Sequence, residues 1–289
     1  MQHRSLFFCR VYTSSMILEG KRIASEMYEA MAGEYAKSGR PARLGIVVVG
    51  ENPVIASFVR IKERAAARLG VEFVRRQLPE SATTEEALAA VEEAVATCDA
   101  VIPQLPMPKH VDSKKILAAV PPSKDVDAIN PTTPSQRRIV HEPVALAVLE
   151  LLDRAGVDVR GKRTVVVGAG RLVGAPSARM LREHGADVHV VTRDQGSLDD
   201  LKTADIVVAG TGVSGLVKPE MLREGVALID AGTSNVPKEN GGIIAGDADP
   251  ACADKCLVFS PVPGGVGPVA VAMIYRNLLT LIKKNAPAA

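Results

Sequence analysis

The residues best suited to acid–base chemistry are an aromatic–lysine pair and two polar side chains in the first half of the chain. We expect a helix over residues 54–69, on which Phe58 and Lys62 stand four positions apart and share one face. An aromatic ring beside an ammonium group suits an aromatic substrate held next to an acid or base. Gln104 and Asp127 fall in expected loops and could converge with Lys62. Each of these residues also has an ordinary explanation. Lys62 could be a solvated lysine on a helix surface, and Gln104 and Asp127 could make loop hydrogen bonds or cap a helix.

A glycine-rich turn in the second half, GAGRLVG over residues 168–174, separates an expected strand over 164–167 from an expected helix over 175–184. Such a turn lets backbone amides and the helix N-terminus face a phosphate group, although it could also serve tight packing alone. The candidate cofactor contacts are Gly168, Ala169, Gly170, Arg171, Val173, Gly174, Thr192, Arg193, Gly212 and Thr233.

Arg193 bears on the choice between the two nicotinamide cofactors. It follows an expected strand over 188–191, where a domain that prefers NAD usually has an acidic residue for the ribose hydroxyls. A guanidinium there suits the 2′-phosphate of NADP, so we favour NADP over NAD. Because Asp194 follows at once, Arg193 could instead be a solvated surface charge.

The segment PVPGGVGP over residues 261–268 is too dense in proline and glycine for a helix or strand to run through it. It is suited either to a site wall that a ligand approaches closely or to a rigid interdomain turn. As a wall, it would add Pro263, Gly264 and Gly265 to Phe58 as substrate contacts.

Apolar runs of strand length alternate with helical stretches. The expected strands cover 44–50, 71–75, 100–102, 164–167, 188–191, 206–209 and 227–230, and the expected helices cover 54–69, 84–97, 113–119, 144–155 and 175–184. This alternation predicts an α/β fold with parallel sheets covered on both faces. Prolines between 121 and 134 place a domain boundary near residues 135–145.

Composition favours small-molecule chemistry. The chain has 289 residues, of which 47% are hydrophobic, and its net charge of +2 gives no electrostatic case for nucleic acid or a membrane surface. We see no apolar run near the roughly 18 residues that a membrane helix needs.

Four cysteines without metal-ligand spacing argue against a metal site and favour the reducing cytoplasm. Residues 1–15 contain two arginines and no acid, as in a transit peptide, but we favour a flexible extension that precedes Met16.

In order and spacing, these motifs resemble the bifunctional methylenetetrahydrofolate dehydrogenase/cyclohydrolase family, the FolD proteins. The resemblance rests on Asn52-Pro53 followed by Lys62, QLPMP over 104–108, KDVD over 124–127, the 168–176 loop and PVPGGVGP over 261–268. It runs from about Met16 to Lys284.

The resemblance implies a folate-binding catalytic domain of residues 16–143 plus 266–289, to which a C-terminal helix returns, and a Rossmann domain of residues 144–265. It also implies a cleft that holds folate against the nicotinamide, a homodimer, and a place in one-carbon metabolism and purine biosynthesis. By position, Lys62 would be the catalytic lysine, Gln104 the glutamine that hydrogen-bonds it, and Asp127 the carboxylate that grips the pterin.

Several positions depart from the family pattern. Phe58 replaces a tyrosine, Ile55 a serine and Ala128 a glycine; VHEP over 140–143 replaces Pro-Cys-Thr-Pro, Val269-Ala270 replaces Met-Thr, and Gly168-Ala169-Gly170 replaces Gly-Arg-Ser, with Arg171 one step beyond. We expect an enzyme that oxidises 5,10-methylenetetrahydrofolate with NADP and hydrolyses the methenyl product to 10-formyltetrahydrofolate. The alternatives are a paralogue with one activity or a modified pterin substrate, and a nucleotide-binding regulatory protein without turnover.

Overall fold

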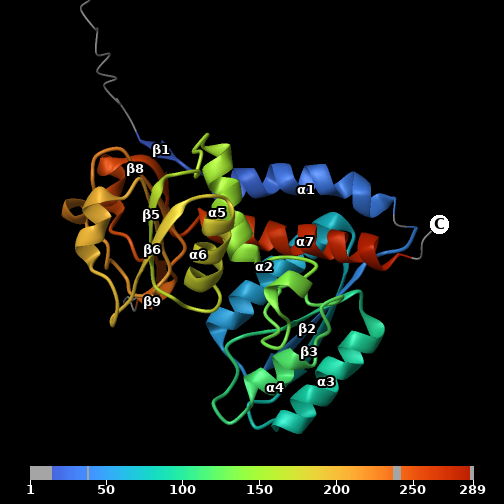
Figure 1. The fold of residues 1–289 in the computed structure, drawn as a ribbon. Coiled ribbons are helices and arrows are strands. Elements are labelled where there is room, and N and C mark those ends of the chain that lie inside the picture. Colours follow the sequence, from blue (N-terminus) through green and yellow to red (C-terminus); the bar gives the residue numbers. More distant parts are fainter. Residues whose placement is uncertain (1–14, 38, 237–241, 287–289) are drawn as a thin grey trace, which may run out of the picture.

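Two parallel β-sheets, joined by long helices, make up the chain (Figure 1). The parallel sheets and the helices that connect their strands confirm the expected α/β class. The computed structural model describes residues 15–37, 39–236 and 242–286. The N-terminal extension expected over 1–15 lies, except for Ser15, outside the described residues.

The smaller sheet carries the first candidate residues. Its strand order is β3-β2-β4, with β2 over Arg43–Val49, β3 over Glu72–Leu78 and β4 over Ala100–Pro103, and both pairs are parallel. The connecting helices are α2 over Pro53–Leu69 and α3 over Thr84–Thr97, and a short helix α4 spans Ser113–Ala118. Apolar side chains of β2 are buried because helices cover the sheet, as the uninterrupted Val/Ile pattern predicts.

The larger sheet has the order β1-β11-β8-β7-β5-β6, and all its pairs are parallel. Its strands are β1 (Met16–Ile17), β5 (Arg163–Val167), β6 (Asp187–Val191), β7 (Ile206–Ala209), β8 (Val226–Asp230) and β11 (Cys256–Ser260), and its helices are α5 (Pro143–Arg154) and α6 (Gly174–Glu183). The strand order reverses at β5, whose two neighbours β6 and β7 both follow it in sequence. The carboxyl ends of β5 and β7 therefore flank a topological switch point, where such sheets bind ligands.

Some elements depart from the expectations. Met16–Ile17, expected in the catalytic domain, pairs with β11, so the chain enters at the edge of the larger sheet. An antiparallel hairpin of β9 (Ser234–Val236) and β10 (Ile243–Ala245) was not expected, and neither was β11. Short 3₁₀ turns cover Ser135–Arg137, Leu198–Thr203, Pro219–Met221 and Pro250–Lys255.

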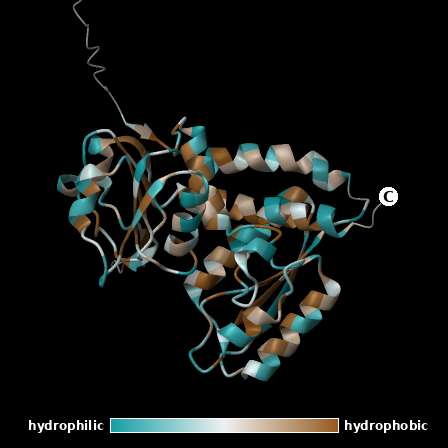
Figure 2. Cartoon of the chain, viewed as in Figure 1, coloured by the Kyte–Doolittle hydropathy of each residue, from teal (hydrophilic) through white to brown (hydrophobic). Residues whose placement is uncertain are grey.

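Helices α1 (Gly20–Ala36) and α7 (Val266–Asn285) lie side by side and reach from the larger sheet across the smaller domain (Figure 1). Among the described helices, α7 alone has the length and hydropathy of a membrane span, although no apolar run of that length was expected. Its apolar side chains pack against α1, α2 and α5. Figure 2 shows hydrophobic residues on the strands of both sheets and on helices that pack against them. The composition of α7 thus follows from its place in the core.

Candidate functional site

Lys62 and Gln104 meet in a buried contact. Lys62 lies in α2, and Gln104 directly follows β4 at the carboxyl edge of the smaller sheet. The Lys62 Nζ donates a hydrogen bond to Gln104 Oε1 over 2.7 Å, and the two residues are only 9% and 8% exposed. The Gln104 Nε2 donates to Leu105 O over 2.7 Å. That second bond orients the amide so that its oxygen faces the lysine.

Burial shifts the pKa values of Lys62 and Asp127 in opposite directions. Desolvation lowers the pKa of Lys62, and the nearby Asp127 carboxylate opposes that shift. Desolvation likewise raises the pKa of Asp127, which Lys62 opposes in turn. Both shifts favour neutral forms because charge is costly in a desolvated cleft. A lysine held in this way can exchange a proton nearer neutrality than a solvated lysine.

The loop that carries Asp127 is built from its own side chains and backbone. Asp125, only 5% exposed, accepts a hydrogen bond from the Asn130 backbone amide over 2.8 Å. Ala128 has φ +54°, in the left-handed region that favours glycine. Alanine is strained in this conformation, which a glycine at position 128 would adopt without that cost.

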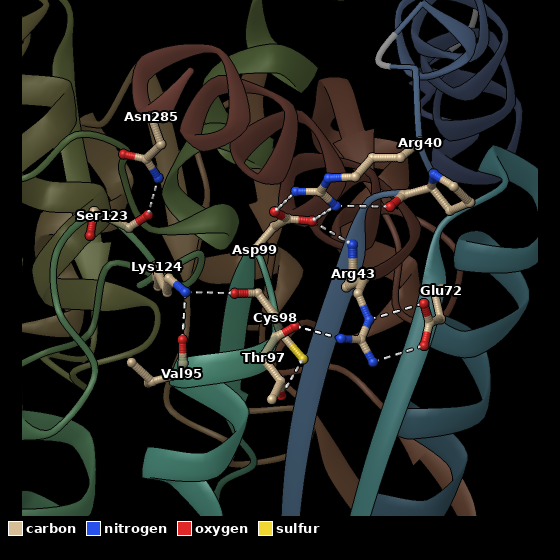
Figure 3. Close-up of polar contacts among 11 residues, drawn as sticks. Arg40, Arg43, Glu72, Val95, Thr97, Cys98, Asp99, Ser123, Lys124 and Asn285 are labelled. Atoms are coloured by element: carbon tan, nitrogen blue, oxygen red, sulfur yellow. Dashed lines mark hydrogen bonds and ion pairs between the residues drawn. The ribbon is translucent and has the colours of Figure 1, made fainter. Parts of the chain in front are cut away.

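Lys124, the first residue of the KDVD motif, has a structural place. Its Nζ donates to Val95 O over 2.5 Å and to Cys98 O over 2.8 Å, at the C-terminus of α3 (Figure 3). A cation there satisfies carbonyls that the helix leaves without partners and complements the helix dipole. Figure 3 also shows Asp99 bonded to Arg40 and to the backbone amide of Arg43, at the start of β2. Lys124 therefore fixes one end of the loop that ends in Asp127.

Residues 261–265 form a tight turn between β11 and α7, and residues 266–268, expected to lie outside any helix, are the first residues of α7. The Gly265 amide donates to Pro261 O over 2.8 Å, and a Cβ on Gly265 would lie 2.1 Å from Ser260 Oγ. A Cβ on Gly20, at the start of α1, would lie 1.8 Å from Gly265 O. Among the described contacts, none joins Pro263, Gly264 or Gly265 directly to Lys62. The turn is thus placed at the domain junction, where a wall or hinge was expected, and its contact with substrate stays a prediction.

The glycine-rich turn packs against the neighbouring loop after β7. Gly168 has φ +100°, and a Cβ on it would lie 2.7 Å from Gly210 O. A Cβ on Gly174 would lie 2.0 Å from Gly168 O, and one on Gly210 would lie 2.3 Å from Val173 Cγ1. Gly170, by contrast, has its nearest such neighbour at 4.0 Å. Close packing therefore requires the first and last glycines, while Gly170 leaves the mouth of the turn open, and Ala169 and Arg171 beside it are exposed.

The other candidate cofactor residues also lie at this edge. Thr192 and Arg193 follow β6, and Arg193 is exposed. Gly212 approaches Thr233, because a Cβ on Gly212 would lie 3.6 Å from Thr233 O. Across the part of the chain that the structure describes, Arg171 and Arg193 form no ion pair. Two guanidiniums without carboxylates, beside an open glycine turn, suit a ligand with phosphate groups.

Two buried aspartates that were not predicted from the sequence support these loops. Asp247, 0% exposed, accepts hydrogen bonds on Oδ2 from the Thr211 backbone amide over 2.5 Å and from Thr211 Oγ1 over 2.8 Å. Asp230, at the end of β8, accepts from Gly232, Asp247 and Ala248 amides. For Asp230 the signal available in the sequence was an acidic residue at the carboxyl end of a buried strand, two positions before a glycine.

The departures at Phe58 and Ile55 change the surface near Lys62. Phe58 is half-buried one turn before the lysine, so the ring is present and the hydroxyl is not. Ile55 is buried and borders a cavity of about 410 Å³, which Asn52, Arg75 and Gln77 also line. An apolar side chain thus stands where the family usually has a hydroxyl.

Comparison with known proteins places both halves of the chain in one family. Residues 18–127 match the model of the tetrahydrofolate dehydrogenase/cyclohydrolase catalytic domain, and residues 143–286 match that of the NAD(P)-binding domain. The bifunctional protein FolD of Halothermothrix orenii is 37% identical over 278 residues, which cover 90% of this chain and 95% of that protein. FolD of Methanoculleus marisnigri is 35% identical, with coverage of 93% and 96%.

Solved structures agree. The dehydrogenase-cyclohydrolase of Trypanosoma brucei, solved with NADP and an inhibitor, superimposes with a TM-score of 0.88 at 32% identity and covers 95% of this chain and 99% of its own. The Campylobacter jejuni enzyme gives a TM-score of 0.87 at 29% identity, with coverage of 94% and 100%. The chain therefore belongs to the tetrahydrofolate dehydrogenase/cyclohydrolase family.

Proposed function

We propose that this chain oxidises 5,10-methylenetetrahydrofolate with NADP and hydrolyses the methenyl product to 10-formyltetrahydrofolate, with Lys62, Gln104 and Asp127 as its catalytic residues. The observation that carries the proposal is the buried Lys62–Gln104 hydrogen bond of 2.7 Å. Family membership supplies the reaction class. Desolvation lowers the pKa of Lys62, and Gln104 holds its amine at the carboxyl edge of the smaller sheet.

In the hydrolytic step, Lys62 acts as a proton carrier. Water attacks the methenyl carbon and gives one proton to the neutral Lys62 amine, which releases it to solvent. The hydroxyl proton of the adduct then moves to N5 of the pterin as the carbon–N5 bond breaks, which leaves the formyl group on N10. Gln104 Oε1 holds one N–H of the amine, so the nitrogen lone pair keeps a defined direction. Asp127 would accept hydrogen bonds from the amino and ring N–H groups of the pterin.

The dehydrogenase step needs alignment more than proton transfer. When bound, NADP would supply the hydride acceptor. The open turn at Gly170, the exposed Arg171 and the exposed Arg193 fit the phosphate groups of such a cofactor. Phe58 and the Pro263-Gly264-Gly265 turn would hold the folate ring so that its methylene carbon faces the nicotinamide.

A purified-protein assay tests both activities separately. Methylenetetrahydrofolate is supplied with NADP or with NAD, and reduced nicotinamide and the methenyl chromophore are followed at different wavelengths. We expect reduced nicotinamide with NADP, and methenyl decay faster than its spontaneous hydrolysis. If no reduced nicotinamide forms with either cofactor, the dehydrogenase assignment fails. Methenyl decay at the spontaneous rate would leave the single-activity alternative, which the missing hydroxyls at Phe58 and Ile55 motivate.

The setting of the enzyme belongs to the same proposal. We infer a cytoplasmic homodimer whose product serves one-carbon metabolism and purine biosynthesis, as the family resemblance implies. The three described cysteines, Cys98, Cys252 and Cys256, are free and buried, which agrees with a reducing compartment. Size-exclusion chromatography with light scattering would test the dimer.

A further inference from the structure

A tyrosine of the C-terminal helix contacts the backbone of α2 at the turn that carries Lys62. Tyr275, 0% exposed, donates its hydroxyl hydrogen to Lys62 O. The backbone of Ala66 acts on the same hydroxyl and opposes the rise of its pKa. Lys62 and Ala66 are four residues apart, so their carbonyl and amide are the two partners of one α-helical hydrogen bond. The hydroxyl therefore lies at the helical hydrogen bond that begins at the proposed catalytic residue.

A second tyrosine repeats this arrangement one helix further out. Tyr35 of α1 donates its hydroxyl hydrogen to Tyr275 O over 2.6 Å, and the backbone of Leu279 opposes the rise of the pKa of the Tyr35 hydroxyl. Tyr275 and Leu279 are also four residues apart, so the Tyr275 carbonyl and the Leu279 amide are the two partners of one α-helical hydrogen bond. Burial raises the pKa of both tyrosines, so both hydroxyls stay protonated and remain donors. A line of hydrogen bonds thus runs from α1 through α7 to the Lys62 turn.

We propose that Tyr275 is a positioning residue for Lys62, and that Tyr35 supports it by holding the α7 backbone from which Tyr275 projects. A hydroxyl placed at a helical hydrogen bond fixes the local bend of the helix. Lys62 Nζ must reach Gln104 Oε1 at 2.7 Å, and an error of about 1 Å in such a geometry can cost about a hundredfold in rate. The Tyr275 hydroxyl does not replace the one missing at Phe58, because it bonds the backbone of Lys62 and not its amine.

The position of α7 supports this role. Asn277, 4% exposed, donates both amide hydrogens, one to Val126 O over 2.9 Å and one to His141 O over 2.8 Å. Val126 immediately precedes Asp127. The same helix therefore holds the Lys62 turn through Tyr275 and the Asp127 loop through Asn277. A core helix that only filled space would need neither set of polar contacts.

The test compares three tyrosine-to-phenylalanine variants. Tyr275→Phe removes the hydroxyl at Lys62, and Tyr35→Phe removes its support. Tyr28→Phe is the matched control: its ring packs edge-on against Tyr275 with centroids 6.4 Å apart, and among the described residues its hydroxyl makes no hydrogen bond. Each variant is assayed for methenyl hydrolysis across pH and, separately, for methylenetetrahydrofolate oxidation.

We expect Tyr275→Phe to lower the kcat of hydrolysis about tenfold and to change the kcat of oxidation less than about twofold. The acidic limb of the hydrolysis profile should shift to higher pH, because a displaced, better solvated Lys62 regains part of its ordinary pKa. Tyr35→Phe should shift the same limb by a smaller amount, and Tyr28→Phe should match the wild type. Loss of packing alone would reduce both activities together and leave the pH profile in place.

An unchanged limb and unchanged hydrolysis in folded Tyr275→Phe would overturn the proposal. If that variant does not fold, Tyr35→Phe decides, and an unshifted limb there counts against it. This inference rests on the role proposed for Lys62, so Lys62→Met is assayed beside the tyrosine variants. If Lys62→Met hydrolyses normally, the proposed function has failed; if it does not, while Tyr275→Phe equals the wild type, only the positioning role has failed.

Discussion

At the scale of single residues, the chemistry depends on side chains whose surroundings change their properties. Lys62 is useful because it is desolvated and held by Gln104, and Asp127 because it lies within electrostatic reach of the lysine. The sequence could nominate these residues from motif order, but the pKa shifts come from burial, which depends on the whole fold. Asp247 was missed for a related reason: its hydrogen-bond partners at 211–212 lie 35 and 36 positions away.

Replacement of Arg193 tests the cofactor preference. Arg193→Ala removes an exposed guanidinium at the end of β6, so we expect the Kd for NADP to rise about tenfold or more while that for NAD changes little. Cofactor fluorescence titration measures both. Arg223→Ala is the control, because Arg223 forms an ion pair with Asp205 and is not among the candidate cofactor contacts. Equal losses for the two cofactors would show that Arg193 is only a surface charge.

Replacement of Asp247 tests the support of the loop after β7. Asp247→Asn removes the charge that holds Thr211 and Gly212, and hydrogen bonds to charged groups contribute about 1.5–3 kcal/mol each. We expect weaker NADP binding, with methenyl hydrolysis at Lys62 largely kept. Asp249→Asn is the matched control, because it loses a partly exposed ion pair with Lys218 and keeps a side-chain oxygen that can accept from the Ala251 amide. Normal NADP affinity in Asp247→Asn would contradict the assignment.

At the scale of elements, local sequence signals were most reliable where they are self-contained. The expected helix over 84–97 agrees with α3 at both ends, and Thr83 and Glu86 form a capping box that fixes its N-terminus. The β9–β10 hairpin and the pairing of Met16–Ile17 with β11 were missed. Such short strands carry almost no periodicity of their own and exist because a neighbouring strand offers free hydrogen-bonding groups. Tyr275 was missed because a tyrosine in an apolar helix looks like core.

The C-terminus of α3 gives a prediction at this scale. Lys124→Met leaves Val95 O and Cys98 O without their cation, so the free energy of unfolding should fall by about 1–2 kcal/mol. Urea denaturation measures the change. Lys115→Met breaks only an exposed pair with Glu85 and should cost less than about 0.5 kcal/mol. Equal effects of the two substitutions would show that Lys124 does not cap the helix.

At the scale of the whole molecule, helices join the two sheets into one framework. One buried carboxyl group, Asp125, lies in a loop beside the smaller sheet, and another, Asp230, ends a strand of the larger sheet. Asp125 supports the Asp127 loop, and Asp230 supports the edge of the larger sheet. Burial raises the pKa of each to about 6. The fold class and the two-domain plan were predictable because Val/Ile strands alternate with helices. The entry of β1 into the larger sheet was not predictable, since it is decided by packing across the full chain.

These carboxyl groups give the stability a defined pH dependence. A carboxyl whose pKa is higher in the folded than in the unfolded state stabilises the fold fully below about pH 4 and loses that contribution as the pH rises through about 6. For Asp230 the loss is about 3 kcal/mol, since one pKa unit corresponds to about 1.4 kcal/mol. Wild type should therefore lose stability relative to Asp230→Asn between pH 4 and pH 7, as measured by urea unfolding. A pH-independent difference would refute this.

The central claim is that Lys62 carries the hydrolytic proton transfer, and the most direct test is the methenyl hydrolysis rate of Lys62→Met. Methionine keeps the length of the side chain and removes the amine, so the fold and NADP binding should persist, as checked by circular dichroism and cofactor titration. Lys115→Met serves as the exposed control. We predict that methenyltetrahydrofolate decays at its spontaneous rate with Lys62→Met and at the wild-type rate with Lys115→Met. Wild-type hydrolysis by folded Lys62→Met would contradict the account.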